Sequence, residues 1–176
     1  MREIKINLRR ELIKQRKAMT KAEKSDADES IFQQLLPFLD NAGSVFCYAS
    51  MEIEVDTRRF IDHCLKKGIS VALPVSGDKE LSFYYIESID ELSKGRYNID
   101  EPPKIRPALA DEKTLCVVPA LCADGNGFRL GYGKGYYDRF LRNFKGTSIT
   151  ICYKDFKREV PTEPFDMRTT FTVFDK

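Results

Sequence analysis

The stretch from Arg129 to Arg139, Arg-Leu-Gly-Tyr-Gly-Lys-Gly-Tyr-Tyr-Asp-Arg, combines residue types that are suited to binding anions. Glycines at alternate positions, 131, 133 and 135, allow backbone conformations closed to other residues and let a ligand approach the main chain. A loop that opens into a helix favours anions, because free N–H groups and the positive end of the dipole face the same way. The helix is predicted from apolar residues at helical spacing: Tyr136, Tyr137, Phe140, Leu141 and Phe144.

Charged side chains around the glycines indicate that the anion is phosphate. Arg129 and Lys134 place cations at the helix end that disfavours them, so a polyanion would relieve the conflict. Asp138 lies four residues after Lys134 and shares its helix face, where it could hold a metal ion that in turn holds phosphates. An ordinary turn followed by a surface Lys–Asp pair, which stabilises by about 0.2–0.5 kcal/mol, is the alternative interpretation.

The common phosphate-binding motifs do not fit this stretch. A P-loop needs Ser or Thr after Gly-Lys, whereas Gly135 follows Lys134, and the dinucleotide fingerprint needs a different glycine spacing. The segment from Arg129 to Leu141 instead resembles the signature of the 5-formyltetrahydrofolate cyclo-ligase family, also called 5,10-methenyltetrahydrofolate synthetase. The resemblance implies an enzyme that uses ATP and Mg²⁺ to close 5-formyltetrahydrofolate into 5,10-methenyltetrahydrofolate, with release of ADP and phosphate.

Two further segments extend the resemblance toward the N-terminus. Residues 5–9, Lys-Ile-Asn-Leu-Arg, resemble the family segment that contributes to the ATP site. Solvated charge on a first helix is the alternative for Lys5 and Arg9, and it is the expected state of Arg16 on the same helix. Residues 54–57, Glu-Val-Asp-Thr, resemble the motif whose Glu contacts the folate. The resemblance therefore implies that Glu54 binds the amino-pyrimidine edge of the pterin, with Tyr48 and Met51 packing nearby.

The C-terminal part of the chain carries one match and two departures. Asp166 matches the family position that joins the Asp of the tyrosine motif in holding magnesium, and two distant carboxylates suit Mg²⁺, which takes few protein oxygens. Family members commonly have another Asp where Thr169 and Thr170 stand, and many have Gln at Phe156. Both changes lie near the expected site and could alter substrate contacts without removing the metal pair.

The resemblance assigns a role to each matching position. Lys134 and Arg129 are the expected catalytic residues, at the transferring phosphates. The expected metal ligands are Asp138 and Asp166. The expected ATP contacts are Lys5, Arg9, Arg129, Leu130, Gly131, Tyr132, Gly133, Lys134, Gly135, Tyr136 and Tyr137. The expected substrate contacts are Tyr48, Met51, Glu54, Tyr132, Gly133, Lys134, Gly135 and Tyr136.

The chemistry of the implied reaction explains these residue types. A formamide oxygen is a poor leaving group, so it is first phosphorylated; the N10 amine then attacks the activated carbon, and phosphate departs. Phosphoryl transfer mainly requires positioning and neutralisation of charge. Lys, Arg, backbone N–H groups and Mg²⁺ supply both without a histidine or a nucleophilic cysteine.

Length and composition bound the other possibilities. A chain of 176 residues with 42% hydrophobic content predicts a single domain, residues 1–176, with a real core. The formal charge of +2 is far from that of a dedicated nucleic-acid binder. The N-terminus has no apolar run of signal or membrane length, so we expect a cytoplasmic protein, a monomer or weak homodimer, whose partners are small molecules and neither nucleic acid nor membrane.

The cysteines and the single histidine do not predict a catalytic centre. The five cysteines have no Cys-x-x-Cys spacing, and three lie in apolar strand-like runs, so we expect buried free thiols in a reducing compartment. His63 lies beside apolar positions of a predicted helix and is interpreted as an ordinary helix-flank residue. The cysteines are Cys47, Cys64, Cys116, Cys122 and Cys152.

Short apolar runs typical of buried strands alternate along the chain with segments of helical apolar spacing. This order predicts an α/β fold, with a mostly parallel open sheet and helices on both faces. The predicted helices cover residues 3–19, 20–36 and 57–67 and the segment after Gly135. Residues 97–107, with three prolines, are predicted to form an extended surface loop. The predicted strands cover residues 45–49, 69–73, 81–86, 115–118, 148–153 and 169–174. Ligands bind beyond the carboxyl ends of such strands, so we expect the 50–57 loop to wall the site.

Two other functions are compatible with the same residues. A sugar-phosphate or CoA-handling enzyme would use the glycine loop for one phosphate and no metal, and metal dependence separates it from the ligase. A non-catalytic module could sequester folate or single-stranded RNA, with tyrosines stacking on bases beside Arg and Lys. RNA binding would depend strongly on salt, and the near-neutral charge argues against it.

Overall fold

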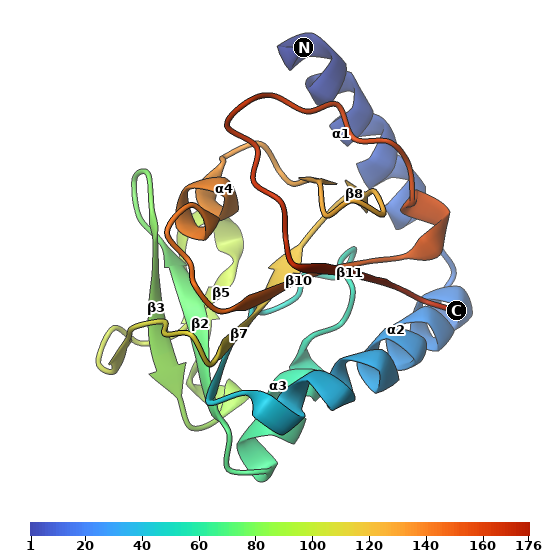
Figure 1. Ribbon diagram of the computed structural model, residues 1–176. Coiled ribbons are helices and arrows are strands. Elements are labelled where there is room, and N and C mark those ends of the chain that lie inside the picture. The colour runs from blue at the N-terminus through green and yellow to red at the C-terminus, as the bar shows by residue number, and fades with distance from the viewer.

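A seven-stranded sheet forms the centre of the computed structural model, which describes residues 1–176 (Figure 1). The strand order is β11-β10-β7-β1-β2-β3-β6. The first five of these strands pair in parallel, whereas β3 is antiparallel to both of its neighbours. The predicted mostly parallel sheet is therefore confirmed. Its strands are β1 (Ser44–Phe46), β2 (Ser70–Ser76), β3 (Leu81–Ile86), β6 (Pro107–Ala108), β7 (Thr114–Pro119), β10 (Thr147–Cys152) and β11 (Phe171–Phe174).

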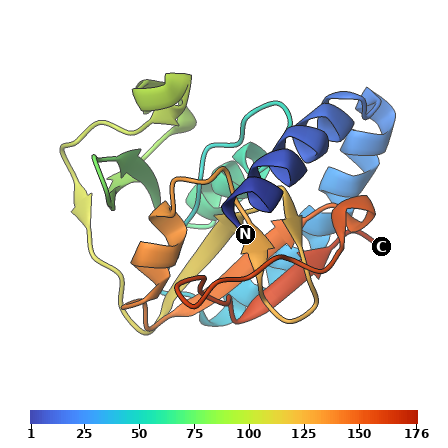
Figure 2. The same ribbon diagram turned by 90° about the horizontal axis from the view of Figure 1, so that it is seen from above.

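Successive residues of the central strands point to opposite faces, and helices cover both. Val45 belongs to the larger apolar cluster, with side chains of the first three helices, whereas Phe46 belongs to a smaller one with Leu141 of the last helix. Figure 2 shows this last helix apart from the other three, across the sheet. Helices on both faces are thus confirmed. The helices are α1 (Arg2–Lys17), α2 (Lys21–Leu35), α3 (Arg58–Lys66) and α4 (Tyr136–Leu141).

The order of the strands places a switch point between β1 and β7. The chain leaves β1 through α3 to β2 on one side and later returns to β7 on the other side of β1. The two strands pair in parallel, with Phe46 opposite Cys116. Ligands of open α/β sheets bind outside the carboxyl ends at such a point. The segments that follow these two ends, residues 47–57 and 120–135, therefore face one another.

Two local predictions need correction. The helix after the glycine loop was expected to reach Phe144 but ends at Leu141, because the N–H groups of Asn143 and Phe144 bind carbonyls three residues back and tighten the chain into a turn. Residues 97–107 are not one extended loop, since they contain the end of a 3-10 turn, β5 and the start of β6. The remaining elements are η1 (Leu36–Asn41), η2 (Ile89–Glu91), β4 (Ser93–Lys94), η3 (Arg96–Asn98), β5 (Asp100–Glu101), β8 (Cys122–Ala123), β9 (Arg129–Leu130) and η4 (Lys154–Phe156).

Other local features agree with the sequence. Thr20 and Glu23 form the capping box that their spacing predicts at the start of α2. All five cysteines are free and buried, and burial raises the pKa of the Cys152 thiol to about 12, so the thiolate is scarce at neutral pH. No helix combines the length and apolar character needed to cross a membrane.

Two leucines, one in the sheet and one just outside it, provide a matched test of this core. Leu115 in β7 is 2% exposed, whereas Leu109, just beyond β6, is 89% exposed. We expect Leu115→Ala to lower the free energy of unfolding by about 2–5 kcal/mol, because it leaves a cavity in the larger apolar cluster that packs against β7. Leu109→Ala should change it by less than about 0.5 kcal/mol. Urea unfolding of both variants measures the difference, and equal losses would contradict the described core.

Candidate functional site

The glycine loop, residues 131–135, lies beside α1 at the carboxyl end of the sheet (Figure 1). Gly133 and Gly135 have φ angles of +93° and +68°, in the region that favours glycine, whereas Gly131 does not. Two of the three glycines therefore meet the predicted conformational need. Nε of Arg9 donates to the Gly131 carbonyl at 2.8 Å, so the guanidinium lies along the loop.

The helix that follows the loop contributes less to anion binding through its dipole than the sequence predicts. The helix after the loop has six residues, fewer than two full turns, and its dipole is the sum of few aligned peptide units. An anion at this loop would therefore depend mainly on side-chain cations and on loop N–H groups. The cations nearest the loop come from α1, from the loop itself and from α4, where Nη2 of Arg139 donates to the Lys134 carbonyl at 2.8 Å.

Lys5 joins α1 to the C-terminal segment that carries a predicted metal ligand. Its Nζ lies 2.6 Å from Oδ2 of Asp166 and 2.9 Å from Oε2 of Glu163, and the residue is 7% exposed. Burial by itself lowers the pKa of this ammonium, but the hydrogen bonds to Asp166 and Glu163 outweigh it, and the pKa is raised. Lys5 is not a solvated surface charge.

Arg129 and Asp138 form a second pair of a cation with a predicted metal ligand. Nη2 of Arg129 lies 3.1 Å from Oδ1 of Asp138, and its Nη1 donates to the Met167 carbonyl at 2.8 Å. The Met167 N–H also donates to Oδ1 of Asp138, at 3.1 Å. The backbone next to Asp166 is thereby tied to Asp138. The Arg129 side chain is 4% exposed, so in this arrangement it neutralises Asp138.

The two carboxylates fit a magnesium ion whose other ligands are oxygens of phosphate and water. Hydrogen bonds engage Oδ1 of Asp138 and Oδ2 of Asp166, and the second oxygen of each carboxylate has no such partner. The chain contains no cluster of three acidic, histidine or cysteine side chains that could hold a metal ion alone. Mg²⁺ commonly binds one or two carboxylates and fills its octahedron with phosphate and water. Their role as metal ligands stays a prediction.

The opposite wall of the loop is formed by the β2–β3 turn and η3. Lys134 is exposed, and its Nζ lies 5.0 Å from the centre of the Tyr97 ring. The Tyr136 hydroxyl donates to the Gly77 carbonyl at 2.7 Å. Tyr97 and Asn98 have φ angles of 62° and 58°, which cost energy in residues other than glycine and cluster at functional sites. Nothing in the sequence pattern singled out Tyr97.

Glu54 lies in the wall beyond β1, 5% exposed. Its Oε2 accepts the Met51 N–H at 2.7 Å, and burial raises the pKa of its carboxyl. The nearby Tyr48 hydroxyl donates to the Val55 carbonyl at 3.3 Å. Met51 thus contributes its backbone to this wall, a role that its side-chain type does not reveal.

Two buried tyrosine hydroxyls have no hydrogen-bond partner. The Tyr132 hydroxyl, in the glycine loop, faces the Glu54 carboxyl closely enough to lower the pKa of that carboxyl but makes no hydrogen bond of full geometry, and the Tyr137 hydroxyl lies at the start of α4. A buried unsatisfied hydroxyl costs about 1–3 kcal/mol. Such groups identify a place where polar atoms of a ligand would be bound favourably.

The residues at the two departures from the family pattern have structural partners. The hydroxyl of Thr169 hydrogen-bonds to that of Thr150 at 2.9 Å, and the Thr170 hydroxyl pairs with Ser148 of β10. Phe156 is 3% exposed and packs under the Arg16 guanidinium, with its ring centre 4.7 Å from Cζ. The two threonines therefore hydrogen-bond to β10. Phe156 instead packs against Arg16, which lies at the carboxyl ends of β1 and β7.

Arg16 is a residue that the sequence reasoning placed wrongly, among the solvated charges of the first helix. It is 3% exposed and reaches carbonyls beyond β1 and β7. Its position could have been found, because Arg16 continues the four-residue spacing of Leu8 and Leu12 and so belongs to the buried stripe of α1.

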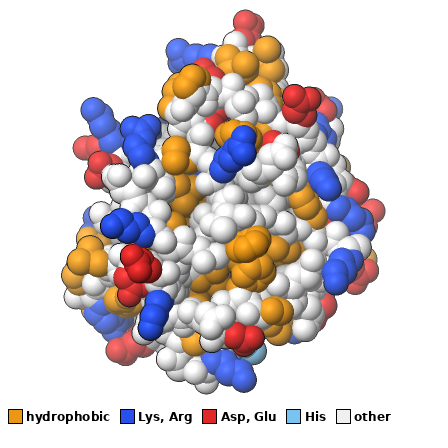
Figure 3. Space-filling model, in the orientation of Figure 1, with side chains coloured by type: hydrophobic (Ala, Val, Ile, Leu, Met, Phe, Trp, Pro, Cys, Tyr) orange, Lys and Arg blue, Asp and Glu red, His pale blue; other side chains and the backbone are white.

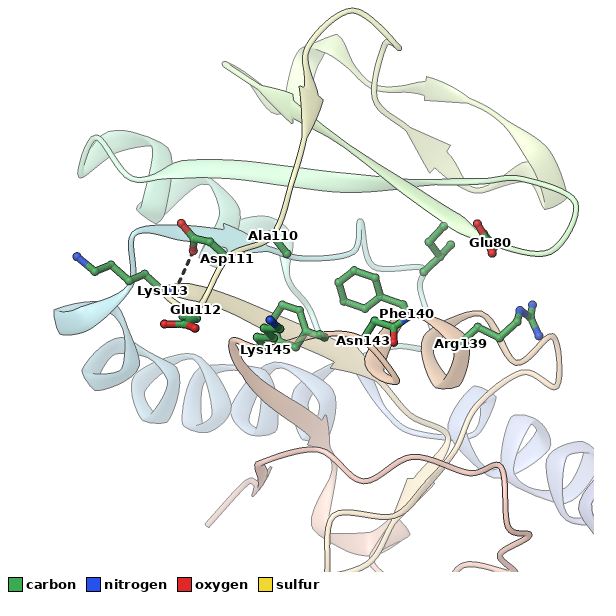
Figure 4. A pocket seen from close by; sticks show the side chains of 11 residues that line it. Glu80, Ala110, Asp111, Glu112, Lys113, Arg139, Phe140, Asn143 and Lys145 are labelled. Atoms are coloured by element: carbon green, nitrogen blue, oxygen red, sulfur yellow. Dashed lines mark hydrogen bonds between the residues drawn. The ribbon is translucent and has the colours of Figure 1, made fainter.

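A cavity elsewhere in the fold does not coincide with this site. It has a volume of about 900 Å³ and lies between α4, the start of β3 and the segment before β7 (Figure 4). Phe140 projects into it from α4, and Asp111 and Lys113 border its far end (Figure 4). None of the predicted site residues lines it. The predicted residues instead lie around the carboxyl ends of β1 and β7.

Comparison with known proteins gives a consistent family. A family model described as the 5-formyltetrahydrofolate cyclo-ligase family matches residues 1–174. A Mycoplasma pneumoniae protein named 5-formyltetrahydrofolate cyclo-ligase is 29% identical over 176 residues, which cover 96% of this chain and 97% of that protein. A Schizosaccharomyces pombe protein named probable 5-formyltetrahydrofolate cyclo-ligase is 29% identical over 153 residues, 76% of this chain and 75% of the relative.

Solved structures agree with this result. The structure of Aquifex aeolicus 5,10-methenyltetrahydrofolate synthetase superposes with a TM-score of 0.86 at 28% identity, covering 98% of this chain and 90% of that one. A 5,10-methenyltetrahydrofolate synthetase from Mycoplasma pneumoniae, at 24% identity and a TM-score of 0.77, shares the fold over 96% of both chains.

Two loop glycines give a matched test of the described backbone. We expect Gly133→Ala to lower the free energy of unfolding by about 1–3 kcal/mol, because an alanine is strained at φ +93°. Gly131→Ala should change it by less than about 0.5 kcal/mol, since its φ is ordinary and nothing lies within 4 Å of the added Cβ. Urea unfolding measures both, and a costlier change at Gly131 would refute the loop conformation.

Proposed function

Because this chain belongs to the 5-formyltetrahydrofolate cyclo-ligase family, we propose that it uses ATP and Mg²⁺ to convert 5-formyltetrahydrofolate into 5,10-methenyltetrahydrofolate. Its relatives are named as ligases of this type. One observation carries the proposal for the site: a cation-lined glycine loop, two carboxylates and a buried glutamate meet at the carboxyl ends of β1 and β7. The free thiols suit the reducing cytosol, where we expect the enzyme to work.

The triphosphate is proposed to lie against residues 131–135. Lys134 is the first choice for the transferring phosphoryl group, because its ammonium is exposed and is not committed to a carboxylate. Arg9 lies along the same loop and adds a second cation. Lys5 and Arg129 neutralise Asp166 and Asp138 and would be shared with phosphate when nucleotide binds. Asp138 and Asp166 would hold the magnesium, which supplies neutralisation of charge on the phosphates.

The pteridine is proposed to lie against Glu54. A carboxylate can accept two hydrogen bonds from an amino-pyrimidine edge, and Glu54 already has one oxygen fixed by the Met51 N–H. The unpartnered hydroxyl of Tyr132 offers a further donor and acceptor beside it. Partial burial of the ring would strengthen these contacts, because charge-assisted hydrogen bonds gain in a medium of low dielectric constant.

The proposed reaction proceeds in two balanced steps. The formyl oxygen attacks the γ-phosphorus of ATP, the bond to the bridging oxygen breaks, and ADP leaves. N10 then attacks the activated carbon, the carbon–oxygen bond breaks, and phosphate departs with the former formyl oxygen as N10 loses its proton. The chain needs to align the reactants and neutralise charge.

The face seen in Figure 3 gives no support to RNA binding. Lys and Arg side chains alternate with Asp and Glu on the face seen in Figure 3, in keeping with the net charge of +2. The apolar side chains on this face lie in separate patches, which is ordinary for a protein surface (Figure 3). The ligase reading therefore remains the one proposed.

Lys134 provides the direct test of activity. Purified protein with Mg-ATP and 5-formyltetrahydrofolate should gain the absorbance of the methenyl product. We expect Lys134→Ala to lower kcat about 100-fold or more, because it removes a preorganised cation from the transferring phosphate. Its fold should be unchanged, since the side chain is exposed. Lys14→Ala, on the exposed face of α1, is the control; full activity of Lys134→Ala would remove this residue from the mechanism.

The metal site predicts a requirement for nucleotide. Two carboxylates with one free oxygen each should bind Mg²⁺ weakly in the absence of ATP, since the ion needs further oxygens. Calorimetric titration of Mg²⁺ should therefore show little uptake by the free protein and clear uptake in the presence of a non-hydrolysable ATP analogue. Equally tight binding in both titrations would contradict a site completed by phosphate.

A further inference from the structure

Arg16 connects the ends of three neighbouring strands with one buried guanidinium. Nη1 donates to the Ile53 carbonyl beyond β1 at 3.1 Å, and Nη2 donates to the Ala120 and Leu121 carbonyls beyond β7 at 2.7 and 2.9 Å. Nε donates to the Leu121 carbonyl at 3.2 Å, and Nη2 also lies 3.5 Å from Sγ of Cys152, at the end of β10. All these acceptors are uncharged.

A cation without a carboxylate among its hydrogen-bond partners is costly to bury. The effective penalty is several kcal/mol per ion, and uncharged carbonyls repay only part of it. Two aromatic rings repay a further part, because Cζ of Arg16 lies 5.2 Å from the Tyr153 ring centre and 4.7 Å from that of Phe156. An apolar side chain would avoid the cost of the buried charge but would leave the strand-end carbonyls without this donor, so the guanidinium serves to tie these strand ends together.

Arg16 acts on Glu54 through a backbone hydrogen bond next to it and through the electrostatic effect of its positive charge. The Ile53 carbonyl that Arg16 binds belongs to the peptide unit that leads into Glu54. Burial raises the pKa of the Glu54 carboxyl, and the positive charge of Arg16 opposes that rise. Arg16 therefore fixes the backbone beside Glu54 and favours its charged form.

Groups from every neighbouring element also act on Glu54. Lys24 of α2 is a second cation that favours its charged form. The remaining titratable groups that interact with Glu54 are the hydroxyls of Tyr48, Tyr132 and Tyr137. Burial raises the pKa of all three, so they stay neutral, and the Met51 N–H and the Tyr132 hydroxyl favour the charged form of Glu54 together with Arg16.

We propose that Arg16 is a positioning residue for the folate: it ties the 50–57 loop to the ends of β7 and β10 and presents Glu54 to the pteridine as a fixed carboxylate. The proposal rests on the proposed function, which places the pteridine at Glu54. It predicts that Arg16 influences the folate subsite and leaves the glycine loop, where the triphosphate is proposed to lie, largely unaffected.

The first measurement needs no ligand. Carbon-13 NMR of glutamate-labelled, full-length protein follows the titration of the Glu54 carboxyl, and loss of the signal in Glu54→Gln assigns it. In Arg16→Met the midpoint should move to higher pH, because the opposing cation is gone while burial remains. In the control Arg10→Met, which changes an exposed arginine of the same helix, the midpoint should stay where it is in the unmodified protein.

The second measurement separates the two substrates. Calorimetry should show that Arg16→Met weakens binding of 5-formyltetrahydrofolate about tenfold or more, while binding of an ATP analogue changes by less than about threefold. The acid limb of kcat/KM should shift to higher pH. Arg16→Lys, which keeps the charge but reaches fewer carbonyls, should retain an intermediate affinity for the folate and a Glu54 midpoint close to that of the unmodified protein.

Three results would overturn the role of Arg16. An unchanged Glu54 midpoint in folded Arg16→Met is one, and a proportional loss of both ligands is another. Failure of both Arg16→Met and Arg16→Lys to fold is the third, since it would assign Arg16 to stability alone. If the unmodified protein binds no folate, the proposed function fails instead, and the NMR titration still decides whether Arg16 acts on Glu54.

Discussion

Burial on both faces of the parallel strands is the constraint on which the rest of this structure depends. Residues of β1, β2 and β7 alternate between two apolar clusters, each covered by helices, so neither face of these strands is open to a polar ligand. The edge formed by the carboxyl ends of the strands is therefore the place where a polar ligand can bind. There the chain leaves the hydrogen-bonded ladder, and its free carbonyls and N–H groups need partners. The site residues supply several of those partners and are held in place by them.

Charge compensation at this edge follows from the same constraint. Lys5 pairs with Asp166, Arg129 with Asp138, and Arg16 with strand-end carbonyls, so buried charges are held by specific hydrogen bonds. In the proposed function the first two cations change partners in part, from carboxylate to phosphate, as magnesium and nucleotide arrive together. Such an exchange keeps the local charge nearly balanced, which avoids the cost of leaving an ion buried and unpaired.

The sequence predicted the parts of this architecture that rest on local pattern. The sheet, the helices on both faces, the capping box at Thr20 and the wall beyond β1 follow from apolar periodicity and capping chemistry. The pairings at the site could not be predicted in this way. Lys5 with Asp166 is a contact across 161 positions, which no local pattern encodes. The family resemblance named both residues but implied other partners for them.

Two further differences have physical explanations. The helix after the glycine loop is shorter than its apolar spacing suggests, because Phe144 packs with Phe140 from a turn, at 5.1 Å between ring centres. Arg16 was interpreted as solvated because a charged side chain usually indicates a surface position. A long arginine side chain can nevertheless lie in a buried stripe when backbone carbonyls accept its hydrogen bonds. Residue type outweighed spacing in that interpretation, and spacing was the better guide.

The central claim is that both substrates meet at the carboxyl ends of β1 and β7. A crystal structure with 5-formyltetrahydrofolate, magnesium and a non-hydrolysable ATP analogue tests it most directly. The account predicts the triphosphate against residues 131–135 near Lys134, and the pteridine within hydrogen-bonding distance of Glu54. Either ligand bound in the cavity of about 900 Å³ beside α4, with the strand ends vacant, would contradict it.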